Sequence, residues 1–327
     1  MPKQEDDYTN NVMKRTDMLN GHGDGSLTNY FGKMQILLNY FVFRKKQVNN
    51  KSLKVYIRMT DTNNKLFDVV VAVGPNDKDI VSKQVKYTQE NVVGYRNIYI
   101  IPFDETFTLD GCITIPESTF PFSKDTFHTF HPDATKRAGW YLQQLFKLYA
   151  GRIIPGILDT YLIIDADTFF FQPTTFIDTN TGAGLFNYST ECHLPYLEHL
   201  NKMHPTLFRM DSHKSGICHH MLFRTTYLNE LINLVEYYHC CPFYEAFFKC
   251  VGDANKSGAS EYEIYFNYML KYHPQDVQIR KLLWKNETSL DAIDPSYDYF
   301  SYHTYLREPP SDETWIEFFY TIPLSEL

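Results

Sequence analysis

Residues 161–171, which read YLIIDADTFFF, constrain the fold of this chain more than any other stretch. The run is short, apolar and rich in β-branched and aromatic residues, which predicts a buried strand. It ends in Asp165 and Asp167, and side chains two residues apart on a strand point to the same side. Two carboxylates at a buried strand end repel each other unless they share a proton or a cation, and hard divalent cations prefer such oxygen ligands. The pattern therefore predicts a metal that in turn holds a phosphate.

Strand and helix patterns alternate before this run, which is typical of a parallel α/β sheet. The predicted strands cover residues 67–74, 97–101 and 161–164, and the predicted helices cover 78–91 and 136–150. The second half is less regular, with predicted strands at 183–187 and 221–224, predicted helices at 226–239 and 260–272, and loops at 104–132 and beyond 294. Ligands of such sheets bind beyond the carboxyl ends of the strands. The Gly74–Asp77 turn and the acidic pair both follow such ends, so we expect them to face one crevice.

Bulk properties exclude some classes of function. A hydrophobic content of 43% over 327 residues is enough for a sizeable core, and a net charge of −8 argues against a nucleic-acid surface. The six cysteines form no CxxC pair, which favours free buried thiols in a reducing compartment. Because the first 30 residues are polar, we expect no secretory signal, and the apolar segment 34–43 is too short to span a membrane as a helix. We expect a cytoplasmic, non-secreted chain with a partly flexible N-terminal extension at 1–60 and a main domain at 61–327.

The Asp-x-Asp pattern has three interpretations. In the first, a metal bridges the carboxylates to a nucleotide diphosphate and neutralises its charge as it leaves. In the second, Asp165 is a phosphorylated nucleophile of a haloacid-dehalogenase-type phosphatase, but Phe169 stands where that motif needs Thr or Val. In the third, the acids cap a helix, but Thr168 and three phenylalanines follow instead of a helix. The first interpretation fits best.

Several segments, in this order, resemble a family of GT-A glycosyltransferases found in bacteria and giant DNA viruses, with mimivirus-type members nearest. They are GPND at 74–77, GWYLQQLFKL at 139–148, DADTFF at 165–170, HHMLF at 219–223 and SEYEIY at 260–265. The likeness covers about 67–303. It implies a Rossmann-like, mostly parallel central sheet flanked by helices, and a catalytic domain over 61–327. It also implies metal-dependent transfer of a hexosyl or N-acetylhexosaminyl group from a nucleotide-diphosphate sugar, expected to be a UDP-sugar, to a glycan or protein hydroxyl. A viral member would act in viral glycosylation, in the host cytoplasm or the virion.

The resemblance also implies roles for individual residues. Asp167 would bind Mn²⁺ or Mg²⁺ directly, Asp165 would face the metal or the ribose, and His303 would complete the metal site. The residues expected along the donor are Gly74, Pro75, Asn76 and Asp77 near the base, Arg137, Gln143 and Lys147 towards the ribose or phosphates, and Ala166, His219 and His220. A solvated helix face remains an alternative for Arg137, Gln143 and Lys147, and aromatic packing remains one for His303 and for one of the adjacent histidines.

Glu261 and Glu263, with Asp167, are the candidate catalytic groups. An inverting transferase needs a base within reach of the acceptor hydroxyl, and either glutamate is a candidate. Ser260 and Glu263 also fit the capping-box pattern, in which Glu263 would cap the helix. Two other functions stay open: a sugar-phosphate nucleotidyltransferase, and a non-catalytic module that binds a nucleotide sugar or a glycan. Residues 1–60 are a candidate arm for contacts in a homo-oligomer.

Overall fold

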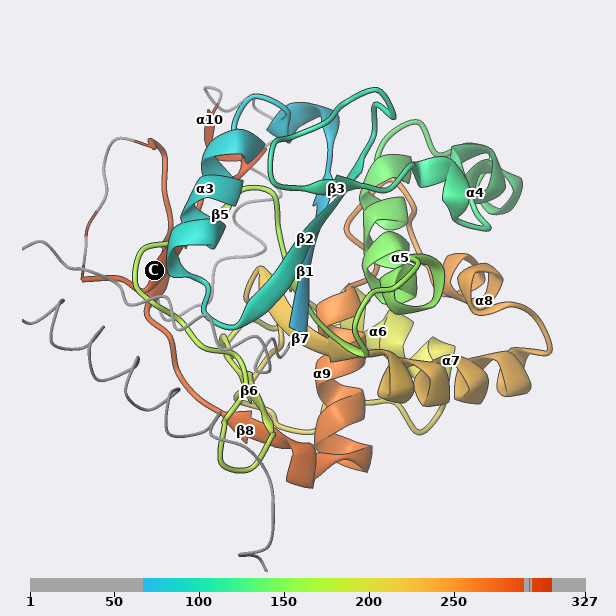
Figure 1. The fold of residues 1–327 in the computed structure, drawn as a ribbon. Helices are drawn as coiled ribbons and strands as arrows, with labels where there is room; N and C mark the ends of the chain where they lie inside the picture. Colours follow the sequence, from blue (N-terminus) through green and yellow to red (C-terminus); the bar gives the residue numbers. More distant parts are fainter. Residues whose placement is uncertain (1–66, 291–293, 295, 308–327) are drawn as a thin grey trace, which may run out of the picture. The chain divides into compact units, whose positions relative to one another are not determined.

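The computed structural model describes residues 67–290, 294 and 296–307, and the predicted N-terminal extension lies outside these residues. Within them the chain forms a mixed α/β fold around a five-stranded sheet in the order β3-β2-β1-β4-β7 (Figure 1). Its strands are β1 (Phe67–Val73), β2 (Tyr95–Pro102), β3 (Ile113–Thr114), β4 (Thr160–Ile164) and β7 (His220–Arg224). The first four strands of this order run parallel, and β7 runs antiparallel to β4. The expected mostly parallel sheet flanked by helices is therefore confirmed.

Helices cover the sheet, and Figure 1 shows α3 and α5 on opposite sides of it. The described helices are α3 (Val81–Asn91), α4 (Lys124–Phe130), α5 (Ala138–Ile153), α6 (Leu194–Met203), α7 (Thr225–His239), α8 (Phe243–Cys250), α9 (Glu261–Tyr272) and α10 (Thr304–Arg307). Single 3₁₀ turns form η1 (Pro75–Asp77), η2 (Glu117–Thr119) and η3 (Pro274–Asp276). Every residue of β1 is buried, because α5 packs on β1 and β4. Covering on both faces explains why β1 and β4 read as continuous apolar runs.

Two smaller sheets accompany the main one, and the three-stranded sheet brings the C-terminal segment to the turn after β4. One has the order β5-β10-β9, and the other pairs β6 with β8. Their strands are β5 (Thr168–Phe170), β6 (Gly184–Phe186), β8 (Val277–Ile279), β9 (Trp284–Asn286) and β10 (Tyr299–Ser301). β10 runs antiparallel to β5 with Ser301 opposite Thr168, and the Tyr302 N–H donates to the Asp167 carbonyl at 2.8 Å. This pairing places His303 beside Asp167.

The sequence reading was wrong in two regions predicted as loops. Residues 104–132 contain β3, η2 and α4, and the segment after 294 contains β10 and α10. These elements are too short and too aromatic to show a clear period of two or 3.6 residues, so the pattern could not separate them from loop. The six cysteines are free as expected, but only Cys218 and Cys250 are buried. No helix of the described residues is long and apolar enough to cross a membrane.

Two glycines of α5 provide a matched test of this packing. A methyl group on Gly151 would lie 2.9 Å from Tyr161 Cε1 and would also collide with Thr225, whereas nothing lies within 4 Å of one on Gly139. We expect Gly151→Ala to lower the free energy of unfolding by about 1–3 kcal/mol through overpacking. Gly139→Ala should raise it by up to about 1 kcal/mol, because alanine favours the helix. Urea unfolding measures both, and a Gly151→Ala protein as stable as the wild type would contradict this packing.

Candidate functional site

The acidic pair lies in a tight turn at the carboxyl end of β4, and not on a continuing strand. The Asp165 N–H donates to the His219 carbonyl at 2.9 Å, and the Thr168 N–H donates to the Asp165 carbonyl at 3.0 Å. The turn nevertheless leaves the two carboxylates close enough for the charge of Asp165 to act on Asp167, where it tends to raise the pKa. The strand therefore delivers both acids to the sheet edge where parallel α/β folds bind ligands.

Asp165 belongs to a network built around Lys147. The Lys147 ammonium donates to Asp165 Oδ1 and to Glu261 Oε1, each at 2.6 Å, and the Tyr262 hydroxyl donates to Asp165 Oδ1 at 2.7 Å. The Lys147 side chain is only 3% exposed, because α9 packs over it, so the alternative of a solvated helix face is wrong for this residue. Burial alone would raise the pKa of Asp165, but the charge of Lys147 and the nearby His219 hold it below its usual value. Burial would lower the pKa of Lys147, and the two carboxylates reverse this and raise it.

Asp167 pairs with His303, the residue that follows β10 by two positions. His303 Nδ1 lies 2.9 Å from Asp167 Oδ2, and both side chains are about one-seventh exposed, at 15% and 14%. Burial would lower the pKa of His303, but the charge and hydrogen bond of Asp167 outweigh it and raise that pKa. Asp167 responds in the opposite sense: burial would raise its pKa, and His303 lowers it overall. The Asp167 carboxylate and the protonated His303 ring thus stabilise each other.

Arg307 on α10 joins this pair to the turn that follows β1. Its guanidinium donates to the Asn76 carbonyl at 2.6 Å and to Asp77 Oδ1 at 2.8 Å, and it lies 3.8 Å from Asp167 Oδ2. The pKa of Asp77 is raised, mainly by burial and next by the charge of Asp167, although Arg307 acts to lower it. The carboxyl ends of β1 and β4 therefore meet around one guanidinium.

The adjacent histidines occupy different environments. His219 has φ 62°, in the left-handed region, and its Nδ1 lies 3.6 Å from Asp165 Oδ2, with its ring 4.6 Å from that of His303. His220 is buried among Phe170, Phe176 and Tyr299, and burial lowers its pKa to about 3. The structure thus brings His219 to the acids and leaves His220 as a neutral core residue.

The two glutamates of α9 are both committed to contacts inside the protein. Ser260 Oγ accepts from the Glu263 N–H at 3.3 Å, so serine caps the helix. The Glu263 carboxylate instead accepts from the Ser215 hydroxyl and from Asn267 Nδ2, the latter at 2.7 Å. Glu261 accepts from Lys147, as described above. Glu263 therefore fixes the loop before β7 and does not close a capping box.

The remaining predicted donor residues are spread around these groups. Arg137 is the N-cap of α5 with φ 65°, and its guanidinium lies 5.5 Å from the Trp140 ring. Gln143 is half-buried on α5, and within the described residues no hydrogen bond joins it to the acids. Ala166 is buried in the turn between the two aspartates, while Gly74 and Pro75 precede Asn76 at the end of β1.

The donor set fits a divalent cation that shares its coordination with a ligand. Among the described residues no group of three or more His, Cys, Asp or Glu side chains is arranged to hold a metal, and Lys147 and Tyr262 occupy one oxygen of Asp165. Two neighbouring ligands of an octahedral ion, each about 2.1 Å from it, lie about 3 Å apart. The 2.9 Å between Asp167 Oδ2 and His303 Nδ1 is a hydrogen bond in this structure, and it would suit two neighbouring ligands of one ion once the imidazole releases its proton. Magnesium-type sites commonly use one or two protein ligands and complete the shell with water and phosphate oxygens.

Sequence reasoning missed three groups near the acids. Arg307 was hidden in a tail predicted as loop, although its spacing of four from His303 would place both on one helical face. Tyr262 lies inside the SEYEIY segment at 260–265, but nothing about this tyrosine in the sequence indicated a role at the site. Glu191, in the loop between β6 and α6, is an isolated acid with no spacing pattern, and burial, then the charge of Glu263, raises its pKa to about 7.

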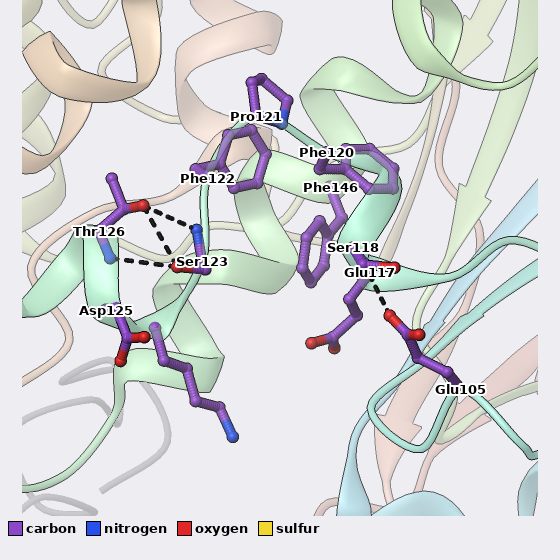
Figure 2. Close-up of a pocket in the computed structure, with 11 residues that line it drawn as sticks. Glu105, Glu117, Ser118, Phe120, Pro121, Phe122, Ser123, Asp125, Thr126 and Phe146 are labelled. Carbon is purple, nitrogen blue, oxygen red and sulfur yellow. Dashed lines mark hydrogen bonds between the residues drawn. The ribbon is translucent and has the colours of Figure 1, made fainter.

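A separate surface cavity lies away from these residues (Figure 2). It has a volume of about 690 Å³ and is lined by residues 117–118 and 120–126 together with Glu105 and Phe146, none of them part of the acidic site. Several of its polar groups bond to one another, because Glu105 accepts from the Ser118 N–H at 2.9 Å and Ser123 caps α4 by accepting from the Thr126 N–H. The cavity adds no chemistry to the site.

Comparisons with known proteins give a family but no activity. A model described as a family of unknown function (DUF6492) matches residues 47–273. No curated protein matches the chain. Among solved structures, the apo form of mouse xyloside xylosyltransferase 1 is similar, with a TM-score of 0.40 and 9% identity over 74% of this chain and 99% of that chain. A likeness this distant does not identify what the site does.

Proposed function

We propose that this chain, which belongs to the DUF6492 family of unknown function, is a metal-dependent glycosyltransferase of GT-A type. It would take a nucleotide-diphosphate sugar, with a UDP-sugar as the first choice, and transfer the sugar to a hydroxyl acceptor. The observation that carries the proposal is the Asp167–His303 pair, 2.9 Å apart at the carboxyl end of a parallel strand. The pair sits where α/β sheets bind nucleotides, and its spacing suits two ligands of one cation.

The charge balance supports a cation in this place. In the described residues the carboxylates of the site outnumber its positive charges: Asp77, Asp165, Asp167 and Glu261 face Lys147, Arg307 and His303. His219 adds no positive charge at neutral pH, because burial lowers its pKa. A nucleotide diphosphate alone would be repelled by such a surface, whereas a diphosphate that carries a divalent cation would be attracted. Metal binding at Asp167 and His303 would therefore prepare the site for the donor.

The chain's own residues then have separate tasks. The cation, when bound, would neutralise charge that develops on the departing diphosphate. Lys147 and Tyr262 hold the Asp165 carboxylate in one orientation through hydrogen bonds of 2.6 and 2.7 Å, leaving its Oδ2 towards His219. Arg307 reaches both the turn after β1 and Asp167, so its guanidinium is placed to take a phosphate oxygen in exchange for Asp77. Each of these contacts orients a group before the donor arrives, which lowers the reorganisation cost of the reaction.

A donor screen tests this function. The protein should hydrolyse at least one of UDP-glucose, UDP-galactose, UDP-xylose, UDP-N-acetylglucosamine, GDP-mannose and TDP-glucose slowly in Mn²⁺, and none in a chelator. Calorimetry should find that UDP binds in Mn²⁺ and at least about tenfold more weakly without it, because the ion is the main attraction for the diphosphate. Failure of UDP and GDP to bind with metal present would refute the proposal. Pyrophosphate release from UTP and a sugar phosphate would favour a nucleotidyltransferase instead.

A further inference from the structure

Three phenylalanines form one wall of the surface cavity drawn in Figure 2. The rings of Phe120, Phe122 and Phe146 pack on one another, with centroids 4.8 to 5.8 Å apart. Each is only 3–6% exposed, so these rings belong to the main core and the cavity opens onto its edge. The cavity volume of about 690 Å³ is in the usual range of small-molecule pockets. A hollow of this size with a fixed aromatic wall suits a small ligand with an apolar body.

Acidic side chains line the same cavity. They are Glu105, Glu117 and Asp125, and Lys124 is the one basic residue of the described lining. Glu105 accepts a hydrogen bond of 2.9 Å from the Ser118 N–H, so its carboxylate lies beside the residue that follows Glu117. Figure 2 shows the side chains of Glu105 and Glu117 at the same end of the cavity, near the ring of Phe146. The cavity therefore joins an apolar wall to an excess of negative charge.

The Glu117 carboxylate has no partner for its charge. Glu117 is half-buried at the start of η2, and within the described residues its side chain makes no hydrogen bond or ion pair. Burial raises the pKa of Glu117, Lys124 acts to lower it without forming an ion pair, and the charge of Glu105 acts to raise it further. A half-buried carboxylate beside a second carboxylate is costly unless a cation lies between them. A ligand with a positive charge would remove this cost.

An organic cation fits this lining better than a metal ion. In the part of the chain that the structure describes, no three His, Cys, Asp or Glu side chains are arranged to hold a metal. Aromatic rings attract ammonium and guanidinium groups, and the rings of Phe120 and Phe146 share the cavity with the acids. A planar amidinium or guanidinium also gives parallel N–H bonds to a carboxylate. The lining thus suits an apolar body that carries such a group.

A small molecule fits better than a peptide, because main-chain groups of the lining are used within the protein. The Ser118 N–H donates to Glu105, and the Thr126 N–H donates to Ser123 Oγ at 3.2 Å. A peptide that binds through its backbone pairs with main-chain groups that are still unpaired. The cavity therefore offers a ligand chiefly side chains.

We propose that this cavity binds a small organic cation, an amine, amidine or guanidine on an apolar body. The positive group lies between Glu105 and Glu117, and the body packs against the wall of phenylalanines. Three carboxylates and one lysine line the cavity, so a ligand with one or two positive charges balances it. The binding site is separate from the proposed function, because none of its lining residues belongs to the acidic site.

The test uses benzamidine, which is a cation, and benzamide, its neutral analogue of nearly the same shape. Calorimetry on the full chain should give benzamidine a Kd of about 1 mM, which is usual for a ligand of this size, and benzamide a Kd at least about tenfold higher. Glu117→Gln and Glu105→Gln should each weaken benzamidine about tenfold, because each removes a charge-assisted contact. Glu198→Gln is the control, because Glu198 is exposed on α6 and outside the cavity, and it should keep the wild-type affinity.

Two further comparisons decide where the cation binds and what carries it. Asp167→Asn should bind benzamidine as the wild type does, because Asp167 does not line the cavity. Loss of binding in Asp167→Asn but not in Glu117→Gln would place the cation at the acidic site and overturn the proposal. The capped peptide acetyl-Phe-Arg-amide should bind more weakly than benzamidine, and tighter binding of the peptide would contradict a small-molecule site. Equal affinities for benzamidine and benzamide, or no binding of either, would overturn the proposal as well.

Discussion

Asp167→Asn is expected to lower metal-dependent hydrolysis of the donor by about 10³-fold or more. The substitution keeps the shape of the side chain but removes the negative charge that faces His303 at 2.9 Å. A catalytic cation contributes several kcal/mol to the transition state, and each 1.36 kcal/mol is a factor of ten in rate. The measurement is the initial rate of nucleotide release in Mn²⁺, together with the affinity for UDP, which should lose its metal dependence.

Asp133→Asn provides the matched control, because Asp133 is exposed and lies outside the site. It should keep the wild-type rate. Asp133→Asn should unfold near the wild-type temperature, and Asp167→Asn at a modestly lower one, because it removes the carboxylate partner of the protonated His303. An Asp167→Asn protein with close to the wild-type rate would mean that the acidic pair does not hold the catalytic cation.

Lys147→Met is expected to cost about 3–5 kcal/mol of unfolding free energy. Lys147 and Glu261 are only 3% and 4% exposed, and removal of the ammonium leaves the carboxylates of Asp165 and Glu261 facing each other without a counter-charge. Lys249→Met is the control, because the Lys249–Glu245 pair on α8 is largely solvated, with lysine 46% exposed. Loss of such an i,i+4 surface pair costs about 0.5 kcal/mol or less. Denaturant unfolding measures both variants.

The double variant Lys147→Met/Glu261→Gln keeps this prediction testable if the single variant folds poorly. It removes one of the two opposed charges and should recover part of the lost stability. The deficit of Lys147→Met should also shrink as the pH falls towards 5, because burial raises the pKa of Glu261 and protonation then relieves the repulsion. Equal stability of the Lys147→Met and Lys249→Met proteins would contradict the buried network.

The parallel sheet could be predicted because its information is local. β4 and, apart from Asp68, β1 are apolar runs that end in acids or in a turn, and α5 between them in the sequence has a clear helical stripe. Fully covered strands carry that pattern whatever the rest of the chain does. β3, α4, β10 and α10 could not be predicted in this way, because each is short and lies in an aromatic or proline-rich segment without a regular period.

The candidate site was only partly accessible from the sequence, for a different physical reason. The helical period places Lys147 on a face of α5 that looks solvated from the sequence. That side chain is buried because α9, more than a hundred residues later, packs over it. His219 adopts a left-handed backbone conformation that no propensity predicts for histidine, and this turns it towards Asp165 while His220 packs in the core. Arg307 reaches Asp167 only through the tertiary pairing of β10 with β5, and its spacing of four from His303 was the one local signal for it. Glu191 interacts with Glu263 and His303, which lie far from it along the chain, so no sequence spacing could reveal it.

Pulsed EPR of Mn²⁺ bound to the protein with UDP tests the central claim most directly. The spectrum should contain ³¹P couplings from the diphosphate and a ¹⁴N coupling from one imidazole, and the ¹⁴N coupling should disappear in His303→Gln. Mn²⁺ that stays free in solution, or that shows phosphorus but no imidazole coupling in the wild type, would contradict a cation held between Asp167 and His303.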